Sequence, residues 1–178
     1  MKRYQFKITL LGVRPIIWRR VVVPDCYTLA QFHDAIQAAM GWENYHLYSF
    51  SNWFQTYENQ SGLSAPLNTL RLSVKSKLNY IYDFGDSWEH GVVLEKILPE
   101  DNKTVEPICL AGKRACPPED CGGIWGYQEK LAVLSVKDTP EYEELIEWLG
   151  ESFEPDRFDL KEANSRLKEL AKERISHE

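Results

Sequence analysis

The chain has 178 residues and a net charge of −6, and 43% of its residues are hydrophobic and 12% aromatic. This length suits one compact domain and excludes a large multidomain enzyme. The aromatic content provides far more buriable surface than a disordered chain contains. The acidic excess disfavours a protein whose whole surface binds phosphates, although a local basic face is compatible with it. We therefore expect a single domain over residues 1–178.

The apolar runs of the sequence are too short to cross a membrane. The longest, such as residues 8–11 and 21–23, fall far below the ~20 residues that span a bilayer. Lys7 and Arg14 interrupt the apolar run that a secretory signal needs near the N-terminus. We expect a cytoplasmic protein without a membrane partner, whose four cysteines are thiols or metal ligands rather than disulfides.

Residues 3–11 alternate between polar and apolar side chains, which is the period of a half-buried strand. Residues 18–23 are β-branched or aromatic and end at Pro24, so they predict a second strand in a hairpin with the first. The side chains expected to face the core are Tyr4, Phe6, Ile8 and Leu10. The side chains expected on a basic outer face are Arg3, Lys7 and at least one of Arg19 and Arg20.

A helix is predicted over residues 29–40. Thr28 and Gln31 form a capping-box pattern at its start, apolar side chains follow at helical spacing, and a glycine supplies the stop. Residues 46–52 suit a further strand. Residues 55–69 are rich in Asn, Gln, Ser, Gly and Pro and predict an exposed loop.

The middle of the chain predicts three more strands, at residues 72–78, 80–84 and 88–98. A tight turn at residues 85–87 joins the last two, and we expect Gly85 at positive φ there and Asp86 bonded to its own backbone. Helices are predicted over residues 126–136 and 140–149 and after Asp159. Because strands come first and most helices last, we predict an α+β fold with a mostly antiparallel sheet, one early helix and a C-terminal group of helices.

Several stretches resemble the plasmid pRiA4b ORF-3-like family. They are residues 80–90 (YIYDFGDSWEH), 112–123 (GKRACPPEDCGG), 148–150 and 153–159, together with residues 40–42 and 46–48. Glu154 stands where the family more often has Asp before the proline. The resemblance covers almost the whole chain. It implies a fold and an association with mobile elements, because relatives occur as passenger genes of some insertion elements, and it implies no activity.

The Asp83-Phe84-Gly85 tripeptide invites comparison with protein kinases, in which such an aspartate holds magnesium. The chain lacks a Gly-rich phosphate loop and a His-Arg-Asp catalytic loop, and it is too short for two lobes. We therefore interpret the tripeptide as part of the hairpin turn. A metal or acid–base role for Asp83 and Asp86 is the less favoured alternative.

The predicted elements give two histidines a favoured role and leave a third open. Strand alternation puts His90 on one face with Trp88, where packing in the core is the favoured interpretation and ligation or catalysis the alternative. His33 lies on the apolar side of the predicted helix and is expected to pack. The role of His46, which follows that helix, stays open.

Cys109, Cys116 and Cys121 fall within thirteen residues and, with His90, offer the ligands of a tetrahedral zinc site. Two prolines between Cys116 and Cys121 stiffen the loop and make the spacing unusual for a zinc knuckle. We favour a rigid, metal-free loop over zinc and over a disulfide, so zinc is a possible cofactor and no cofactor is firmly implied. Cys26 is remote in sequence and is expected to be buried.

Residues 122–126 precede a predicted helix, so their backbone N–H groups are a candidate anion site. Glu119 and Asp120 lie directly upstream and are candidates to occupy the helix end themselves, which would repel a phosphate. A cation or a basic partner side chain suits this acidic loop better.

The favoured function is a non-catalytic binding or accessory module whose partner is a protein segment, a small ligand or a metal. Its pocket is expected between the 80–90 hairpin and the 112–123 loop, with the candidate residues Tyr82, Asp83, Asp86, Trp88, His90, Glu119, Asp120 and Tyr127. The alternative is a metal-binding protein or a metal-dependent hydrolase or nuclease that uses Asp83, Asp86, His90, Glu119 and Asp120. The basic hairpin residues suggest a third, weaker possibility, a DNA-associated role without a recognition helix.

Overall fold

The computed structural model describes residues 1–99, 106–150 and 153–175. The strands are β1 (Arg3–Leu10), β2 (Trp18–Pro24), β3 (Tyr48–Ser51), β4 (Thr56–Tyr57), β5 (Lys77–Tyr82), β6 (Trp88–Leu98) and β7 (Ile108–Lys113). The helices are α1 (Leu29–Met40), α2 (Gln60–Leu63), the 3-10 helix η1 (Leu67–Leu70), α3 (Gly123–Leu134), α4 (Pro140–Leu149) and α5 (Leu160–Ile175).

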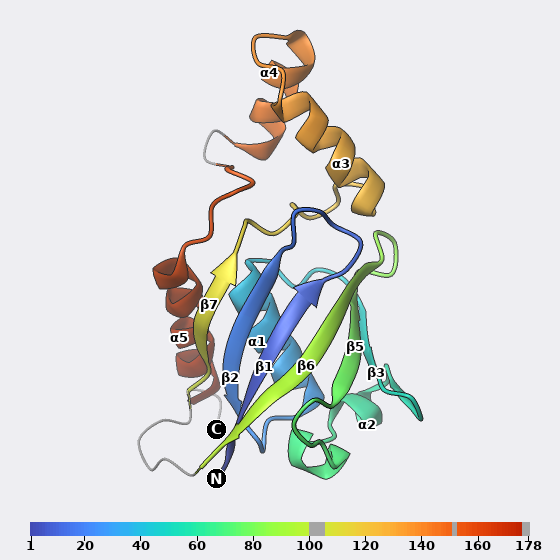
Figure 1. Cartoon of the computed structure of the whole chain (residues 1–178), viewed down its shortest axis with the longest axis vertical. Helices are drawn as coiled ribbons and strands as arrows, with labels where there is room; N and C mark the ends of the chain where they lie inside the picture. The colour runs from blue at the N-terminus through green and yellow to red at the C-terminus, as the bar shows by residue number, and fades with distance from the viewer. Residues whose placement is uncertain (100–105, 151–152, 176–178) are drawn as a thin grey trace.

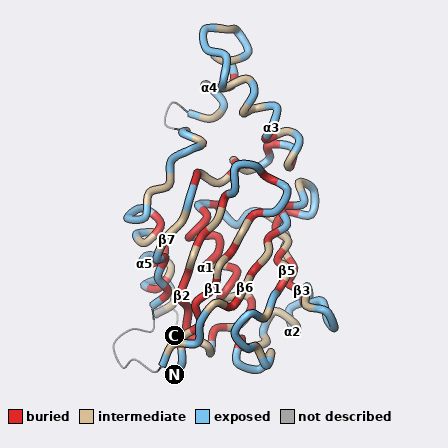
Figure 2. The backbone as a smooth tube through the Cα atoms, in the orientation of Figure 1, coloured by how far each residue is buried: buried red, intermediate tan, exposed pale blue. Residues whose placement is uncertain are grey.

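The strands form one antiparallel sheet in the order β4-β3-β5-β6-β1-β2-β7. Helix α1 packs on one face of this sheet, α5 packs beside α1 and β7, and α3 and α4 project beyond the end of the sheet (Figure 1). The predicted α+β class, with a mostly antiparallel sheet, one early helix and C-terminal helices, is therefore confirmed. Buried residues concentrate between the sheet and α1 (Figure 2).

The register of the first hairpin is confirmed. The four side chains predicted to face the core, Tyr4, Phe6, Ile8 and Leu10, are all buried. Arg3, Lys7 and Arg20 lie on the other face and are partly exposed. One face of these two strands therefore packs against α1, and the other carries basic side chains.

Arg19 does not belong to that basic face, because the alternation of β2 directs it toward α1, where it is 2% exposed. Its Nε donates to the carbonyl oxygen of Ala39 at 2.9 Å, and its Nη1 donates to the carbonyl oxygens of Trp18 and Lys113. These acceptors replace water around the buried guanidinium group. Arg19 thus ties α1 to β2 and β7 and is unavailable to a partner on the outer face.

Helix α1 begins and ends as the sequence predicts. Thr28 Oγ1 accepts a hydrogen bond from the Gln31 backbone N–H, and Gln31 Oε1 accepts one from the Thr28 N–H. Gly41 at the C-terminal end adopts a φ of 99°, which glycine tolerates without strain. Phe32 and Ile36 are fully buried, so the apolar stripe of α1 forms the centre of the core.

The later helices are correctly placed, although α3 begins at Gly123 rather than at residue 126. Thr139 Oγ1 accepts a hydrogen bond from the Tyr142 N–H at the start of α4, and Asp159 Oδ1 accepts hydrogen bonds from the first N–H groups of α5. Ala163 of α5 is buried. None of the helices in the described ranges is long and apolar enough to cross a membrane.

The sequence misplaces one strand. The strand predicted at residues 72–78 is wrong over most of its length, because β5 begins at Lys77 and continues into the segment predicted at 80–84. Lys75 has a φ of 76°, and its N–H donates to the carbonyl oxygen of Leu94, so the chain is still turning toward β5 at this point.

Two further segments differ from the prediction. The supposed loop at residues 55–69 contains β4, α2 and η1, and it buries Tyr57 and Leu67. Strand β7, which carries Cys109, has no regular alternation in the sequence and so is not predicted. Both errors arise because tertiary contacts stabilise segments whose own pattern is weak: β7 packs beside β2 and α5, and the 55–69 segment contacts β3 and α1.

Candidate functional site

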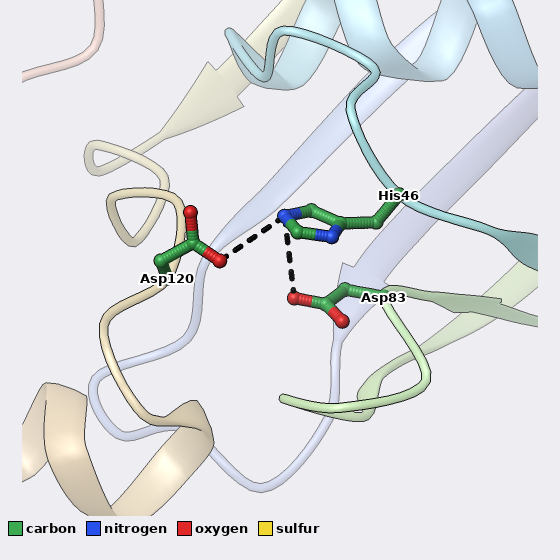
Figure 3. Close-up of side chains that lie close together, drawn as sticks. All are labelled: His46, Asp83 and Asp120. Carbon is green, nitrogen blue, oxygen red and sulfur yellow. Dashed lines mark ion pairs between the residues drawn. The ribbon is translucent and has the colours of Figure 1, made fainter.

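Three segments that are distant in sequence meet at one end of the sheet. His46 precedes β3, Asp83 follows β5, and Asp120 lies in the loop between β7 and α3 (Figure 3). Strand register explains the first pair, because Tyr48 of β3 pairs with Tyr82 of β5 and the Asp83 N–H donates to the Leu47 carbonyl oxygen. The residues just before β3 therefore lie beside those just after β5.

The turn after β5 holds Asp83 in a fixed orientation. Asp83 and Ser87 have φ angles of 56° and 53°, and Asp83 Oδ1 accepts a hydrogen bond from the Gly85 N–H at 2.9 Å. Asp83 tolerates its positive φ because its short side chain bonds the local backbone. The prediction that Gly85 supplies positive φ and that Asp86 bonds its own backbone is therefore wrong, because Asp83 and Ser87 adopt the positive φ angles and Asp83 makes the backbone bond. This bond leaves Oδ2 of Asp83 directed toward His46.

The predicted contact between the 80–90 hairpin and the 112–123 loop is present. Asp86 Oδ2 accepts a hydrogen bond from the Gly122 N–H at 3.1 Å, directly before α3. Asp86, rather than Glu119 or Asp120, therefore occupies the helix end that the sequence marks as a candidate anion site. Its carboxylate would repel a bound phosphate there.

Glu119 links the loop to the end of the sheet. Its Oε1 accepts hydrogen bonds from the Tyr82 hydroxyl at 2.9 Å and from the Glu43 N–H at 3.0 Å. Burial and the Glu119 hydrogen bond raise the pKa of Tyr82, so its hydroxyl stays protonated and donates. The Tyr82 oxygen in turn accepts a hydrogen bond from the Tyr45 N–H at 3.1 Å. Glu119 is therefore oriented with its Oε2 directed toward His46.

The imidazole of His46 lies among three carboxylates. Its Nε2 is 3.2 Å from Asp120 Oδ1, 3.7 Å from Asp83 Oδ2 and 3.9 Å from Glu119 Oε2. His46 Nε2 and Glu119 Oε2 are both enclosed, and neither has a hydrogen-bond partner within the described residues. Over the ranges that the structure describes, His46, Asp83 and Asp120 form the one group of His, Cys, Asp or Glu side chains whose ligand atoms all lie within 4.8 Å of one another.

A cavity of about 570 Å³ adjoins this group of side chains. Glu119 and Asp120 line it and also face His46, so the cavity and the His46 cluster share one wall. Trp42 and Trp148 supply aromatic surface on other sides, and Arg166 supplies a positive charge. The cavity therefore combines aromatic and charged walls of the kind found in small-molecule sites.

The structure divides the predicted pocket residues into two sets. Those at the hairpin–loop junction are Tyr82, Asp83, Asp86, Glu119 and Asp120. Trp88, His90 and Tyr127 are buried beneath it, at no more than 1% exposure; Tyr82 is also 0% exposed, but its hydroxyl reaches Glu119 at the junction. The His90 ring lies between those of Trp42 and Tyr80, and burial lowers the pKa of His90 to about 4. A ligand at the junction thus does not reach this second set.

The structure does not assemble the predicted zinc ligands. Cys109, Cys116, Cys121 and His90 are all described, yet they form no group with ligand atoms within 4.8 Å of one another. Burial raises the pKa of all three thiols, that of Cys121 to about 12. Cys109 belongs to β7, whereas Cys116 and Cys121 lie in the loop between β7 and α3. Cys26 is exposed, not buried.

The carboxylates of the metal alternative partly converge. Asp83, Glu119 and Asp120 come together, while Asp86 and His90 do not, and His46 takes the place of the histidine. In the sequence, two features mark His46: it lies in the family-like stretch 46–48, and it stands at the start of a predicted strand. Neither feature shows which strand lies beside it, so the sequence does not reveal the role of His46.

An imidazole nitrogen and carboxylate oxygens are ligands for divalent cations such as Zn²⁺ and Mn²⁺. Three protein ligands leave coordination positions open to water or to a second ligand. Because Asp120 also lines the cavity, such positions would be within reach of a molecule held there.

Comparison with known proteins shows similarity over most of the chain. The sequence profile of the plasmid pRiA4b ORF-3-like proteins matches residues 2–162. The uncharacterised protein y4hQ of Sinorhizobium fredii is 40% identical over 159 residues, which cover 83% of this chain and 81% of y4hQ. The crystal structure of MM3350, a protein of unknown function from Methanosarcina mazei, has 42% identity and a TM-score of 0.80 and covers 90% of this chain and 96% of MM3350.

Proposed function

This chain belongs to the plasmid pRiA4b ORF-3-like family, and from the site we propose that it binds a divalent cation through His46, Asp83 and Asp120. The observation that carries the proposal is the position of His46 Nε2, which is enclosed, lacks a hydrogen-bond partner and faces Asp120 Oδ1 at 3.2 Å. An enclosed ring nitrogen that makes no hydrogen bond is unfavourable, and ligation of a cation held by the neighbouring carboxylates would satisfy it.

Charge balance supports the same proposal. Three carboxylates directed at one point repel one another when ionised, and enclosure of the Asp83 and Glu119 side chains, at 9% and 16% exposure, strengthens the repulsion between these two. A divalent cation compensates this charge more completely than a protonated imidazole. Glu119 is held by two donors on Oε1, so its Oε2 serves as a nearby fourth oxygen that can orient a bound water or approach the cation.

The proposed cation site also accounts for the favoured binding pocket at the hairpin–loop junction. The cavity beside it shares Glu119 and Asp120 with the His46 cluster. We therefore propose an accessory binding module in which the cation forms one wall of the cavity and a small ligand or partner side chain supplies the remaining coordination.

Calorimetric titration of chelator-treated protein with Zn²⁺, Mn²⁺ and Mg²⁺, one metal at a time, tests the proposal. We expect saturable one-to-one binding of Zn²⁺ or Mn²⁺ and a higher melting temperature of the metal-loaded protein. Asp120→Asn removes one charged ligand and should weaken binding by about tenfold or more. Asp138→Asn is the matched control, because Asp138 is exposed, lies outside the site and has a φ of 63° that asparagine tolerates.

Two results would contradict the proposal. One is the absence of saturable binding for all three metals. The other is an equal affinity of the Asp120→Asn variant, the control and the parent protein. If a protonated His46 alone balances the carboxylates, His46→Gln should lower the melting temperature of chelator-treated protein, and added metal should leave the parent's melting temperature unchanged.

A further inference from the structure

The sheet face opposite α1 carries a charge unlike that of the whole protein. In the described part of the chain no helix packs on this face, which is turned toward the viewer in Figure 1. Strand register places six basic side chains there, Arg3, Lys7, Arg20, Lys77, Lys96 and Lys113, and two acidic ones, Glu89 and Glu95. The chain as a whole has a net charge of −6, so basic residues are concentrated on what we call the open face.

The basic side chains follow the sheet in ordered rows. Lys77, Lys7 and Arg20 belong to one row of cross-strand neighbours, because Lys77 and Lys7 both pair with Val93, and Lys7 pairs with Arg20. Adjacent strands lie about 4.8 Å apart, so these charges succeed one another across the sheet at one or two strand spacings. A chain of phosphates running across the strands meets several cations in succession.

Trp18 lies beside this row. Its partly exposed ring is 5.2 Å from Lys7 Nζ and 5.3 Å from Arg20 Cζ, measured to the ring centroid. Lys113 pairs with Trp18 across β2 and β7 and adds a third cation nearby. An aromatic ring bordered by cations is the arrangement that stacks a base while holding the adjoining phosphates.

The arginine next to Trp18 is already oriented. Arg20 Nε donates to Glu95 Oε2 at 2.6 Å and Arg20 Nη2 donates to Glu95 Oε1 at 3.0 Å, and Gln5 Nε2 donates to the same Oε2 at 2.8 Å. Glu95 sits where a bulge in the β1–β6 pairing shifts the register. The pair reduces the entropy that Arg20 would lose on binding, while the lysines carry most of the uncompensated charge.

We propose that the open face binds single-stranded nucleic acid, with its phosphates on the lysine and arginine row and a base stacked on Trp18. A duplex fits less well, because the basic groups lie on a twisted sheet and not on an element that enters a groove, and because a paired base cannot present its face to Trp18. The acidic helix α4 projects beyond the sheet, and charges more than about 8 Å away are largely screened at physiological ionic strength.

Fluorescence anisotropy with a labelled thymidine oligonucleotide of about 15 nucleotides tests this proposal, at NaCl concentrations from about 50 to 300 mM. We expect the association constant to fall with salt, with a log–log slope of about −0.7 for each phosphate contacted. Lys7→Gln and Lys113→Gln should each lower the affinity and reduce the slope by about 0.7. Trp18→Leu should weaken binding by about tenfold and leave the slope unchanged.

Lys168→Gln is the matched control, because Lys168 is an exposed lysine on α5 and outside the open face. It should leave both the affinity and the slope unchanged. Circular dichroism and melting temperature establish that each variant is folded, and addition of chelator should not change oligonucleotide binding, which separates this surface from the cation site.

The proposal is overturned if the oligonucleotide does not bind, if a duplex of the same length binds equally well, or if Lys168→Gln has the effect of Lys7→Gln. Binding to phosphatidylserine vesicles without binding to the oligonucleotide would also overturn it, and would assign the open face to an anionic membrane surface.

Discussion

The buried face of the sheet and the loops at its end use the same residue types in different ways. On the buried face, His90 of β6 is fully buried and borders the rings of Trp42 and Tyr80. At the end, His46 lies outside any strand and faces the carboxylates of Asp83 and Asp120. Burial lowers the pKa of His90 to about 4, so that imidazole stays neutral and packs, whereas His46 meets oxygen ligands.

The difference teaches that the place of a histidine in the fold decides its role more than the residue type does. His90 lies in a strand that pairs with both β1 and β5, and it is 0% exposed, so no ligand reaches it. A side chain just before β3 is carried by a loop, and loops from β5 and β7 reach the same point. The buried face therefore contributes stability and the loops at the end of the sheet carry the candidate site. Mutations on the buried face should change mainly the free energy of unfolding, and mutations in the loops should change mainly cation binding.

The largest expected effect comes from removing a large side chain of the buried face. Trp88 is 0% exposed and packs near Trp42 and Tyr127. Trp88→Ala should lower the free energy of unfolding by about 3–5 kcal/mol, because it leaves a cavity that the surrounding rings cannot fill. Urea denaturation measures this loss. A loss below about 1 kcal/mol would show that the buried face around Trp88 is not a tightly packed core.

The second prediction concerns acid. Burial lowers the pKa of both His33 and His90 to about 4, below the unfolded value of about 6.5. The unfolded state then binds more protons between pH 6.5 and 4. Each histidine's contribution is complete above pH 6.5 and falls by about 1.4 kcal/mol for each pH unit toward 4. Urea denaturation at pH 7.5, 6 and 5 should show a shallower pH dependence for His90→Gln than for the parent protein.

Parallel pH dependences of the parent protein and the His90→Gln variant would contradict this assignment. His33→Gln provides a second test, because His33 bonds the Tyr80 hydroxyl and Asn44 Oδ1 and is enclosed independently of β6. Carboxylates that protonate in the same pH range affect the parent protein and both variants equally. The difference between the pH dependence of a variant's stability and that of the parent therefore reports the substituted histidine.

The third prediction acts on the contact between hairpin and loop. Gly123 has a φ of 65°, and a Cβ atom there would lie 2.6 Å from the backbone oxygen of Asp86. Gly123→Ala should therefore cost about 1–3 kcal/mol in unfolding free energy and weaken cation binding, because the loop carrying Asp120 must move. Gly150→Ala is the control, since its φ of 77° is also positive but no atom of the described residues lies within 4 Å of the added Cβ. Equal effects of the two substitutions on cation binding would show that the contact does not position the site.

The smallest effect on stability is expected at the site itself. The Asp120 side chain is 72% exposed, so Asp120→Asn should change the unfolding free energy of chelator-treated protein by less than about 0.5 kcal/mol. The same variant should abolish most of the rise in melting temperature that Zn²⁺ or Mn²⁺ produces. A large loss of stability without metal would instead assign Asp120 a structural role.

Much of the fold follows from local patterns in the sequence. The alternation from Tyr4 to Leu10 identifies the buried face of β1, and the pairing of Thr28 with Gln31 places the start of α1. The family resemblance and the α+β class also come from the sequence. The buried face of β1 and the start of α1 depend on neighbours within one strand or one turn of helix, where spacing alone decides which side chains share a face.

Only the tertiary structure shows which side chains come together at the candidate site. No local pattern shows that the buried Arg19 guanidinium group finds acceptors at Ala39 of α1 and Lys113 of β7, nor that residues 108–113 form a strand beside β2. His46 was undecided because its partners are set by the pairing of Tyr48 with Tyr82. Sites at strand ends are assembled by segments far apart in the chain, so their geometry depends on register and loop contacts that no local pattern contains.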